Sequence, residues 1–345
     1  MRAFRLTGPG SARLVEVETP EPGPGRVRLD VLAAGVCRSD LAVLDRVGAL
    51  GYGLPFTFGH EICGRVAALG PGVTGVGVGD EVVVHAPVGC GRCRRCGRGE
   101  TQYCDHGHAS GAAGFGLGLD GGMADAVVVG ADRLVSSAGL VPAHAAVLAD
   151  AGLTSYHAVA GSLARLSDAD AVAVVIGVGG LGHVALSILR ALTGATVVAV
   201  DLREQALELA RELGADHTAT TGTCAEVVRA ATDGRGADVV FDFAVAPSTA
   251  DVTPSLLRKG ADLVLVGSGG GVVPVTKPGP LPAGTRVSLP FWGSRAELAE
   301  VVGLARRGLL PVRTTEFGLA EAPRVFGRLA AGEVVGRAVL VPGLG

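Results

Sequence analysis

The sequence predicts a two-domain α/β protein in which a β-rich domain accompanies a doubly wound parallel sheet. The 345 residues are more than one hydrophobic core usually organises, so we expect two domains. Residues 1–148 hold short strand-like runs separated by glycine and proline, whereas strands and helices alternate from about Asp150 onward. Alternating βαβ units with apolar strands are typical of a parallel sheet covered on both faces.

The expected elements fix the domain boundaries. Strand-like runs in the β-rich part include Arg26–Leu32 and Glu81–His85. Apolar runs and helical spacing then predict strands at 171–176, 196–200, 238–243, 263–266 and 287–291, with helices at 181–192 and 204–213. The last fifty or so residues return to mixed structure, with a helix near 296–306 and a strand near 338–341. We therefore assign residues 1–150 and 294–345 to the β-rich domain, and residues 151–293 to the parallel-sheet domain.

Composition and charge argue against several functions. The chain has 30 Lys and Arg against 33 Asp and Glu, a net charge of −3, which does not favour binding to nucleic acid or an anionic membrane. Tyr and Trp are too scarce for an aromatic nucleic-acid platform. The first ten residues lack the apolar core of a secretion signal, and the longest apolar run is too short to span a bilayer. We therefore expect a cytoplasmic protein.

A glycine-rich turn follows the first apolar strand of the parallel-sheet domain. The residues after Ile176 form G-x-G-x-x-G and lead directly into a predicted helix. These glycines permit a tight turn, close approach of the backbone to a pyrophosphate, and close packing of the helix on the strand. The helix N-terminus then presents free N–H groups to phosphates. The predicted dinucleotide-binding residues here are Gly177, Gly179, Gly180, Leu181 and Gly182.

An acidic residue ends the next strand and indicates which dinucleotide binds. Asp201 lies twenty-four residues after Gly177, where a carboxylate can accept hydrogen bonds from the ribose hydroxyls of NAD and repel a 2′-phosphate. We therefore expect NAD, although the neighbouring Arg203 could serve a 2′-phosphate. The alternative is that Asp201 only caps the following helix.

Four cysteines crowd into fifteen residues with the spacing C-x2-C-x2-C-x7-C. Four thiolates saturate a tetrahedral Zn²⁺ ion, so this lobe, residues 89–105, is predicted to hold a structural zinc. Disulfides or an iron–sulfur cluster are alternatives that the spacing alone leaves open. The four predicted ligands are Cys90, Cys93, Cys96 and Cys104, and the interspersed arginines that can offset their charge are Arg92, Arg94, Arg95 and Arg98.

Further motifs give the sequence a specific resemblance. Cys37-Arg38-Ser39-Asp40 and Gly59-His60-Glu61-x-x-Gly64 precede the four-cysteine lobe, and Gly336-Arg337 lies near the end. In this order, and over almost the whole chain, these pieces resemble the zinc-containing medium-chain alcohol dehydrogenases, most closely bacterial NAD-dependent secondary-alcohol dehydrogenases. The resemblance implies a GroES-like catalytic domain, a Rossmann domain, NAD, and two zinc ions per chain.

The resemblance implies that one of these zinc ions is catalytic and is held by Cys37, His60 and Asp150. A carboxylate is a competent zinc ligand, although Asp150 could instead cap the next helix. Glu61 is expected to coordinate transiently or to support the ligands, and Asp40 to hydrogen-bond the far nitrogen of His60. A fourth, open position would bind an alcohol for reversible NAD⁺-linked oxidation.

The same resemblance implies that the Ser39 hydroxyl takes the proton of the alcohol. The alternative is that Ser39 only caps a helix that starts near Asp40. Many family members carry a histidine five residues after the ligand cysteine, to pass this proton to solvent. This chain has Ala42 at that position, so the proton must leave by another route.

The resemblance also places residues around the cofactor and substrate. It implies that Thr154 packs on the nicotinamide and that Arg337 reaches the pyrophosphate, unless Arg337 only forms a surface ion pair. The nicotinamide pocket is expected to be lined by Val266, Gly267 and Ser268. The aromatic residues Tyr52, Phe115 and Trp292 are weaker candidates for pocket walls, because large aromatic side chains are more often core.

Two other functions stay open. One is a polyol or sugar dehydrogenase of the same superfamily. The other is a zinc-free relative, either quinone reductase-like or structural, against which the set Cys37, His60 and Asp150 argues. The expected partner is a small alcohol or ketone, and the resemblance suggests a homodimer or homotetramer joined near 287–291. Cys63 and Cys224 have no predicted role.

Overall fold

The computed structural model describes residues 1–107 and 111–344, which form two compact units. Unit 1 comprises Met1–Leu153, Trp292–Arg306 and Val312–Gly345. Unit 2 comprises Thr154–Phe291 and Arg307–Pro311. The short segment Arg307–Pro311 was expected in the β-rich domain and instead packs with unit 2.

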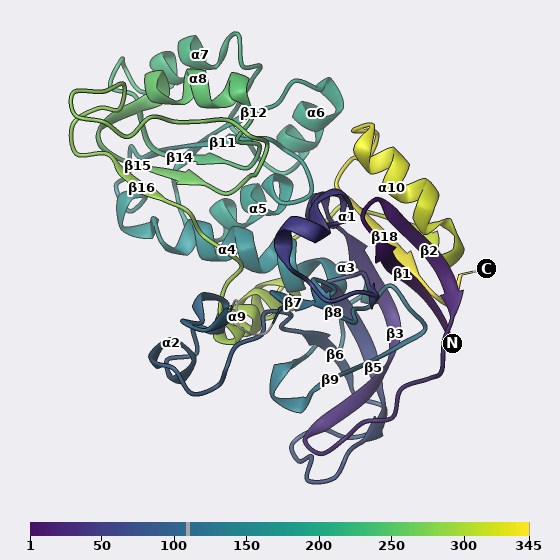
Figure 1. The fold of residues 1–345 in the computed structure, drawn as a ribbon. Helices are drawn as coiled ribbons and strands as arrows, with labels where there is room; N and C mark the ends of the chain where they lie inside the picture. Colours follow the sequence, from purple (N-terminus) through teal and green to yellow (C-terminus); the bar gives the residue numbers. More distant parts are fainter. Residues whose placement is uncertain (108–110, 345) are drawn as a thin grey trace. The chain divides into compact units, whose positions relative to one another are not determined.

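Unit 1 is built around a large mixed sheet with the order β10-β6-β5-β3-β18-β17, in which β9 also pairs with β3 (Figure 1). These strands are β10 Leu134–Ser136, β6 Glu81–Val84, β5 Glu61–Leu69, β3 Arg26–Val36, β18 Arg337–Val341, β17 Thr314–Gly318 and β9 Ala126–Gly130. A smaller sheet has the order β2-β1-β4, and β7 pairs with β8. The bounds are β1 Arg2–Gly8, β2 Ser11–Glu16, β4 Phe56–Thr57, β7 Gly114–Phe115 and β8 Gly118–Leu119.

The long strand β3 shows how the sequence positions the site. Its first half alternates buried Val27, Leu29 and Val31 with side chains that are less buried, as a strand with one face on the core should. From Ala33 onward every residue is buried, and the strand delivers Cys37 into the interior of unit 1.

The helices of unit 1 connect and flank these strands. They are α1 Arg38–Leu50, α2 Arg94–Gly97, α3 Pro142–Val147, α9 Arg295–Arg306 and α10 Ala322–Ala330. Short 3₁₀ turns lie at Thr101–Tyr103, Ala131–Arg133 and Leu319–Glu321, and a π-helical turn, η4, at Leu148–Gly152. The helix α4, Leu153–Ala160, begins at the boundary between the units. Among the described residues, no helix is both long and apolar enough to cross a membrane.

Unit 2 is a doubly wound sheet with the order β13-β12-β11-β14-β15-β16, and all its strand pairs are parallel. Helices α5 and α6 lie on one face, and α7 and α8 on the other (Figure 1). The strands are β11 Val172–Ile176, β12 Thr196–Val200, β13 His217–Ala219, β14 Ala237–Asp242, β15 Leu257–Leu265 and β16 Arg286–Ser288. The helices are α5 Gly182–Leu192, α6 Glu204–Glu212, α7 Cys224–Ala231 and α8 Pro247–Leu256, with a 3₁₀ turn at Leu163–Arg165.

The predicted fold class, a β-rich part and a doubly wound parallel sheet, is confirmed, and the differences concern element ends. The strand expected at 263–266 begins at Leu257, and the edge strand expected at 287–291 ends at Ser288. Pro290 lacks the N–H that would continue the ladder, which explains the shorter edge strand. Leu181 caps α5 rather than starting it.

Candidate metal and cofactor sites

Cys37, His60 and Asp150 converge from three separate segments of unit 1. One donor atom from each lies within 4.8 Å of the other two, and all three residues are buried. Asp150 Oδ2 lies 3.6 Å from Cys37 Sγ and 3.5 Å from His60 Nε2. A thiolate, an imidazole and a carboxylate are zinc-binding groups, and three protein ligands leave a fourth position for water or substrate. The donor set therefore fits a catalytic zinc ion.

The π-helical turn η4 presents Asp150 to the other two residues. Turns of this kind are rare and occur often at functional sites. Asp150 lies inside the turn rather than ahead of a helix, so the capping alternative is wrong. The next backbone N–H, that of Ala151, donates to Glu61 Oε1 over 3.2 Å and so ties the turn to the start of β5.

Asp40 links the two other ligands. One carboxylate oxygen, Oδ2, accepts the backbone N–H of Cys37 at 2.8 Å and completes the first turn of α1. The other, Oδ1, lies 3.2 Å from His60 Nδ1, although the two atoms are not aligned as a regular hydrogen bond. Burial lowers the pKa of His60, but the carboxylates of Asp40 and Asp150 outweigh that effect and raise it well above 6.5. The cluster thus favours positive charge where a cation is expected.

Glu61 and Arg337 form a buried ion pair beside the ligands. Arg337 Nε donates to Glu61 Oε2 at 2.9 Å, and its Nη2 donates to Glu61 Oε1 and, over 3.2 Å, to Asp150 Oδ2. The side chain of Arg337 is 4% exposed and that of Glu61 is fully buried. A surface ion pair for Arg337 is therefore wrong, while its contact with the pyrophosphate stays a prediction. Burial raises the pKa of Glu61, and Arg337 opposes that rise.

The space for this ion pair exists because residue 35 is glycine. A Cβ atom at Gly35 would overlap the carboxylate of Glu61, its partner across the β3–β5 pair. The glycine of the Gly35-Val36-Cys37 stretch is thus required by the buried carboxylate.

Ser39 lies next to the predicted cysteine ligand. Its hydroxyl donates to Cys37 Sγ at 2.9 Å. Cys37 is the N-cap of α1 and Ser39 lies within the first helical turn, so the alternative in which Ser39 caps this helix is wrong. The proton-transfer role stays a prediction.

The four-cysteine lobe also gathers its sulfur atoms. One sulfur from each of Cys90, Cys93, Cys96 and Cys104 lies within 4.8 Å of the others, and the described cysteines are not joined as disulfides. Cys104 Sγ accepts the backbone N–H groups of Cys90 and His106 at 3.2 and 3.4 Å, and Cys93 Sγ accepts that of Cys96 at 3.4 Å. Such N–H···S contacts stabilise thiolates. The arrangement therefore fits a closed, four-thiolate metal site.

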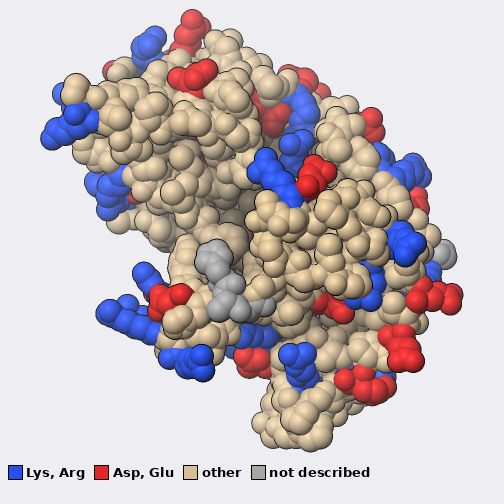
Figure 2. Space-filling view, in the orientation of Figure 1, with Lys and Arg blue, Asp and Glu red and all other residues tan. Residues whose placement is uncertain are grey.

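Two further features of this lobe match its predicted role. A Cβ atom at Gly89 would lie 2.7 Å from Cys96 Sγ, so the chain there passes directly under the sulfur cluster. Figure 2 shows basic side chains gathered over the segment that contains α2. The predicted charge-balancing arginines, Arg92, Arg94, Arg95 and Arg98, are all exposed.

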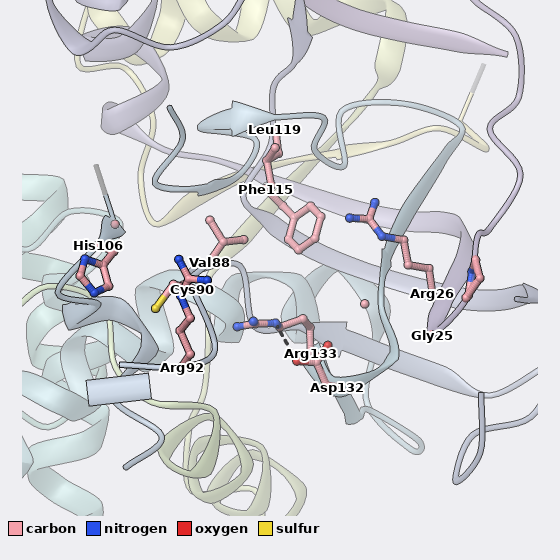
Figure 3. A pocket seen from close by; sticks show the side chains of 14 residues that line it. Gly25, Arg26, Val88, Cys90, Arg92, His106, Phe115, Leu119, Asp132 and Arg133 are labelled. Atoms are coloured by element: carbon pink, nitrogen blue, oxygen red, sulfur yellow. Dashed lines mark ion pairs between the residues drawn. The ribbon is translucent and has the colours of Figure 1, made fainter. Parts of the chain in front are cut away.

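A separate cavity of about 550 Å³ adjoins the lobe, and Cys90, Arg26, Arg133 and Phe115 are among its lining residues (Figure 3). Cys37, His60 and Asp150 are not among the residues that line this cavity, whereas Phe115 is.

The glycine turn of unit 2 has the three features that a bound pyrophosphate requires. Gly177 has φ +87°, which a side chain would disfavour. A Cβ at Gly182 would overlap the carbonyl oxygen of Gly177, so only glycine allows α5 to pack so closely on β11. Gly179 faces open space, with nothing within 4 Å of a Cβ built there. The backbone at that point is accessible to a ligand.

The Asp201 carboxylate accepts hydrogen bonds from the glycine turn and from Arg203. Its Oδ2 accepts the N–H of Val178 at 2.9 Å, while Oδ1 accepts Arg203 N at 3.0 Å and Arg203 Nε at 3.2 Å. The N-cap of α6 is Arg203, so the alternative in which Asp201 is that cap is wrong. The positive charge of the Arg203 guanidinium is thus paired with the Asp201 carboxylate.

Four more of the predicted cofactor residues, Thr154, Val266, Gly267 and Ser268, lie in unit 2. Val266, Gly267 and Ser268 follow β15, as Gly177 follows β11, so both segments lie at the carboxyl edge of the parallel sheet where ligands bind. The N–H groups of Val266 and Gly267 donate to Asp242 O at 2.9 and 3.1 Å. Thr154 is buried at the start of unit 2.

Sequence reasoning missed two features of these sites. It gave no sign that Arg337 contacts Asp150, because the two residues are 187 positions apart and meet only through the sheet. It ranked Trp292 low, yet the indole packs against His60. Cys63 and Cys224 prove to be buried thiols of the two units, outside both metal clusters.

Known proteins resemble the chain over nearly its whole length. Residues 23–139 match the alcohol dehydrogenase GroES-like domain, and residues 180–307 match the zinc-binding dehydrogenase family. An NAD-dependent alcohol dehydrogenase from Sulfolobus acidocaldarius is 35% identical over 342 residues, covering 95% of each chain. A D-arabinose 1-dehydrogenase (NADP(+)) from Saccharolobus solfataricus is 32% identical, covering 95% of this chain and 93% of that one. The crystal structure of an alcohol dehydrogenase from Aeropyrum pernix superposes with a TM-score of 0.92 at 34% identity, covering 99% and 100% of the two chains.

Proposed function

Because the chain belongs to the zinc-containing medium-chain alcohol dehydrogenase family, we propose that it oxidises alcohols reversibly with NAD⁺ at a zinc ion, with secondary alcohols preferred. The convergence of Cys37, His60 and Asp150 carries the proposal. These three different zinc-binding side chains are buried, and their ligand atoms lie within 4.8 Å of one another. A zinc-free enzyme would not need this set of ligands.

Zinc held by Cys37, His60 and Asp150 would supply Lewis acidity and so lower the pKa of an alcohol bound at the open position. The residues around it prepare the ligands. The negative charge of Asp40, 3.2 Å from His60 Nδ1, favours a proton on that nitrogen. His60 Nε2 would then carry no proton and could bind the metal. Arg337 offsets part of the negative charge that Glu61 and Asp150 place in the interior.

The oxidation removes a hydride and a proton from the alcohol. NAD⁺, when bound, would accept the hydride of the carbinol carbon. The proton of the alcohol oxygen would pass to Ser39 Oγ, and the Ser39 hydroxyl, which donates to Cys37 Sγ, would turn away from that sulfur to release its own proton. Since Ala42 carries no titratable group, we infer that water accepts the proton from Ser39.

The choice of NAD over NADP is supported by Asp201. Its carboxylate follows β12 and pairs with Arg203, so Arg203 offers a 2′-phosphate no uncompensated positive charge. The D-arabinose relative is named as an NADP(+) enzyme, so the cofactor must be tested directly.

The same relative gives a second candidate function, oxidation of a sugar. A substrate panel separates the two. We expect NAD⁺-dependent oxidation of isopropanol and of a phenyl-substituted secondary alcohol, much slower oxidation of ethanol, and little oxidation of D-arabinose. Activity should disappear on treatment with a zinc chelator and return with added zinc. Efficient oxidation of D-arabinose alone would favour the sugar dehydrogenase, and chelator-resistant activity would rule out the zinc mechanism.

We also propose that the chain forms a homo-oligomer through the edge strand β16. This strand ends the sheet order of unit 2, and Leu289 and Phe291 just beyond it are 75% and 47% exposed. Pairing with a second copy would cover both the open edge and these apolar side chains. Sedimentation should show a dimer or tetramer for the wild type and monomers for Leu289→Asp with Phe291→Asp; an unchanged mass would contradict this interface.

A further inference from the structure

The indole of Trp292 packs edge-on against the predicted zinc ligand His60. The two ring centroids lie 5.8 Å apart with an interplanar angle of 78°, and Trp292 is 3% exposed. The far end of the indole reaches β7, where a Cβ atom at Gly114 would lie only 3.2 Å from Trp292 Cη2. Trp292 therefore occupies the space next to the metal cluster, between His60 and the backbone of β7.

The backbone of Trp292 needs support to stay in this position. Its φ is +50°, in the left-handed region, which a bulky residue other than glycine rarely adopts. Such conformations persist only where the surrounding structure holds them, and they cluster at functional sites. The next residue, Gly293, packs so closely on Leu153 that a Cβ atom there would lie 2.6 Å from Leu153 Cδ1.

His85 makes a buried hydrogen bond to this segment. Its Nε2 lies 2.8 Å from the carbonyl oxygen of Gly293, and a carbonyl only accepts, so Nε2 carries the proton. His85 is 1% exposed, and its Nδ1 has no hydrogen-bond partner among the described residues. Burial lowers its pKa to about 4, so the ring is neutral. His85 is also absent from both metal clusters, which leaves its contact with Gly293 as its visible role.

We propose that Trp292 is a specificity-determining residue of the metal site and that His85 is the positioning residue that holds it beside His60. This inference rests on the proposed function, since it assumes a metal at Cys37, His60 and Asp150. The indole gives the site an apolar aromatic wall. That wall fits an alcohol with an apolar or aryl substituent on the carbinol carbon, and it offers little to replace the water lost by a polyhydroxy substrate.

Substrate selectivity tests the role of Trp292. We expect Trp292→Ala to lower the ratio of kcat/KM for a phenyl-substituted secondary alcohol over isopropanol about tenfold or more, because the phenyl group loses the aromatic wall beside His60. Trp292→Phe keeps an aromatic wall and should change the ratio less than about threefold. Zinc content should stay at the wild-type value in both variants. An unchanged ratio in active, zinc-replete Trp292→Ala overturns the inference, whereas a wild type without zinc at Cys37 overturns the proposed function instead.

Fluorescence tests the role of His85 without an activity assay, because Trp292 is the only tryptophan in the sequence. Cobalt exchanged for zinc should quench Trp292 strongly in the wild type and much less in Cys37→Ser, which keeps only the cysteine-lobe metal. His85→Leu removes the hydrogen-bond donor to the Gly293 carbonyl. The fluorescence emission of Trp292 should then move to longer wavelength, and its quenching by cobalt should weaken. His85→Gln keeps an N–H donor and should restore both. Wild-type emission and quenching in His85→Leu, or equal loss in folded His85→Gln, would overturn the positioning role.

Discussion

Arg337 binds Glu61 and Asp150 with one guanidinium in the interior of unit 1. Its Nε donates to Glu61 Oε2 at 2.9 Å, and Nη2 lies 3.2 Å from Asp150 Oδ2, so a residue 187 positions away contacts a predicted metal ligand. The buried cluster of Cys37, Asp40, Glu61 and Asp150 is rich in groups that carry negative charge when ionised. Within the protein itself, Arg337 places a positive charge against two of them, Glu61 and Asp150.

Removing this cation should therefore be costly. Arg337→Gln takes away the cation that binds the buried Glu61 carboxylate through two nitrogen atoms, and we expect a loss of about 3–5 kcal/mol in the free energy of unfolding. Urea titration of the zinc-replete protein measures it. Arg65→Gln is the matched control, because its ion pair with Glu81 is half exposed and should contribute less than about 1 kcal/mol. Adding Glu61→Gln to Arg337→Gln should recover part of the loss; equal costs for Arg337→Gln and Arg65→Gln would contradict the role of the pair.

Gly35 should tolerate no side chain. Gly35→Ala places a methyl group on the Glu61 carboxylate, and we expect about 1–3 kcal/mol of destabilisation together with weaker retention of the zinc at Cys37. Gly48 is the control glycine. It lies in α1 with nothing within 4 Å of a Cβ built there, so Gly48→Ala should be neutral or stabilising. Thermal unfolding and zinc analysis of both variants decide the point, and a harmless Gly35→Ala would show that Glu61 moves freely.

Asp201 should determine the cofactor. Asp201→Ala removes the predicted ribose acceptor and the negative charge paired with Arg203, so KM for NAD⁺ should rise about tenfold or more while that for NADP⁺ falls. Steady-state kinetics with both cofactors measure the change. Adding Arg203→Ala should abolish the gain for NADP⁺. If Asp201→Ala keeps the wild-type preference, discrimination resides elsewhere in unit 2.

His85 should make stability depend on pH in mildly acidic solution. Burial lowers its pKa from an ordinary 6.5 to about 4 in the folded chain, so the folded state favours the neutral ring. The contribution is therefore complete above pH 6.5 and is lost as pH falls from 6.5 toward 4, by about 3 kcal/mol in total. Urea midpoints across this range should fall more steeply for wild type than for His85→Gln. Parallel curves would show that His85 does not titrate in this way.

Local patterns in the sequence predict much of this protein. The strand Val172–Ile176 is a continuous apolar run, as a strand buried on both faces must be, and the glycine turn follows it directly. The cysteine lobe is equally local, because four ligands within fifteen residues have little freedom to lie apart. These features can be predicted because they depend on the spacing of residues within one short segment.

The remaining features depend on contacts between distant segments. The pairing of Val339 in β18 with Gly35 in β3 sets the register that brings Arg337 to Glu61, and no periodicity marks it. The position of Trp292 depends on a positive φ and on His85, which lies 208 residues from Gly293. The end of β16 at Ser288 was readable in principle from Pro290.

Zinc content per chain in the wild type, Cys37→Ser and Cys90→Ser, measured beside NAD⁺-dependent oxidation of a secondary alcohol, tests the central claim most directly. We predict two zinc ions in the wild type. Cys37→Ser should hold one zinc ion and lose oxidation with its fold intact, whereas Cys90→Ser should lose the other and unfold more easily. A wild type with one zinc ion or none, whose content and activity are unchanged by Cys37→Ser, would contradict the catalytic site built from Cys37, His60 and Asp150.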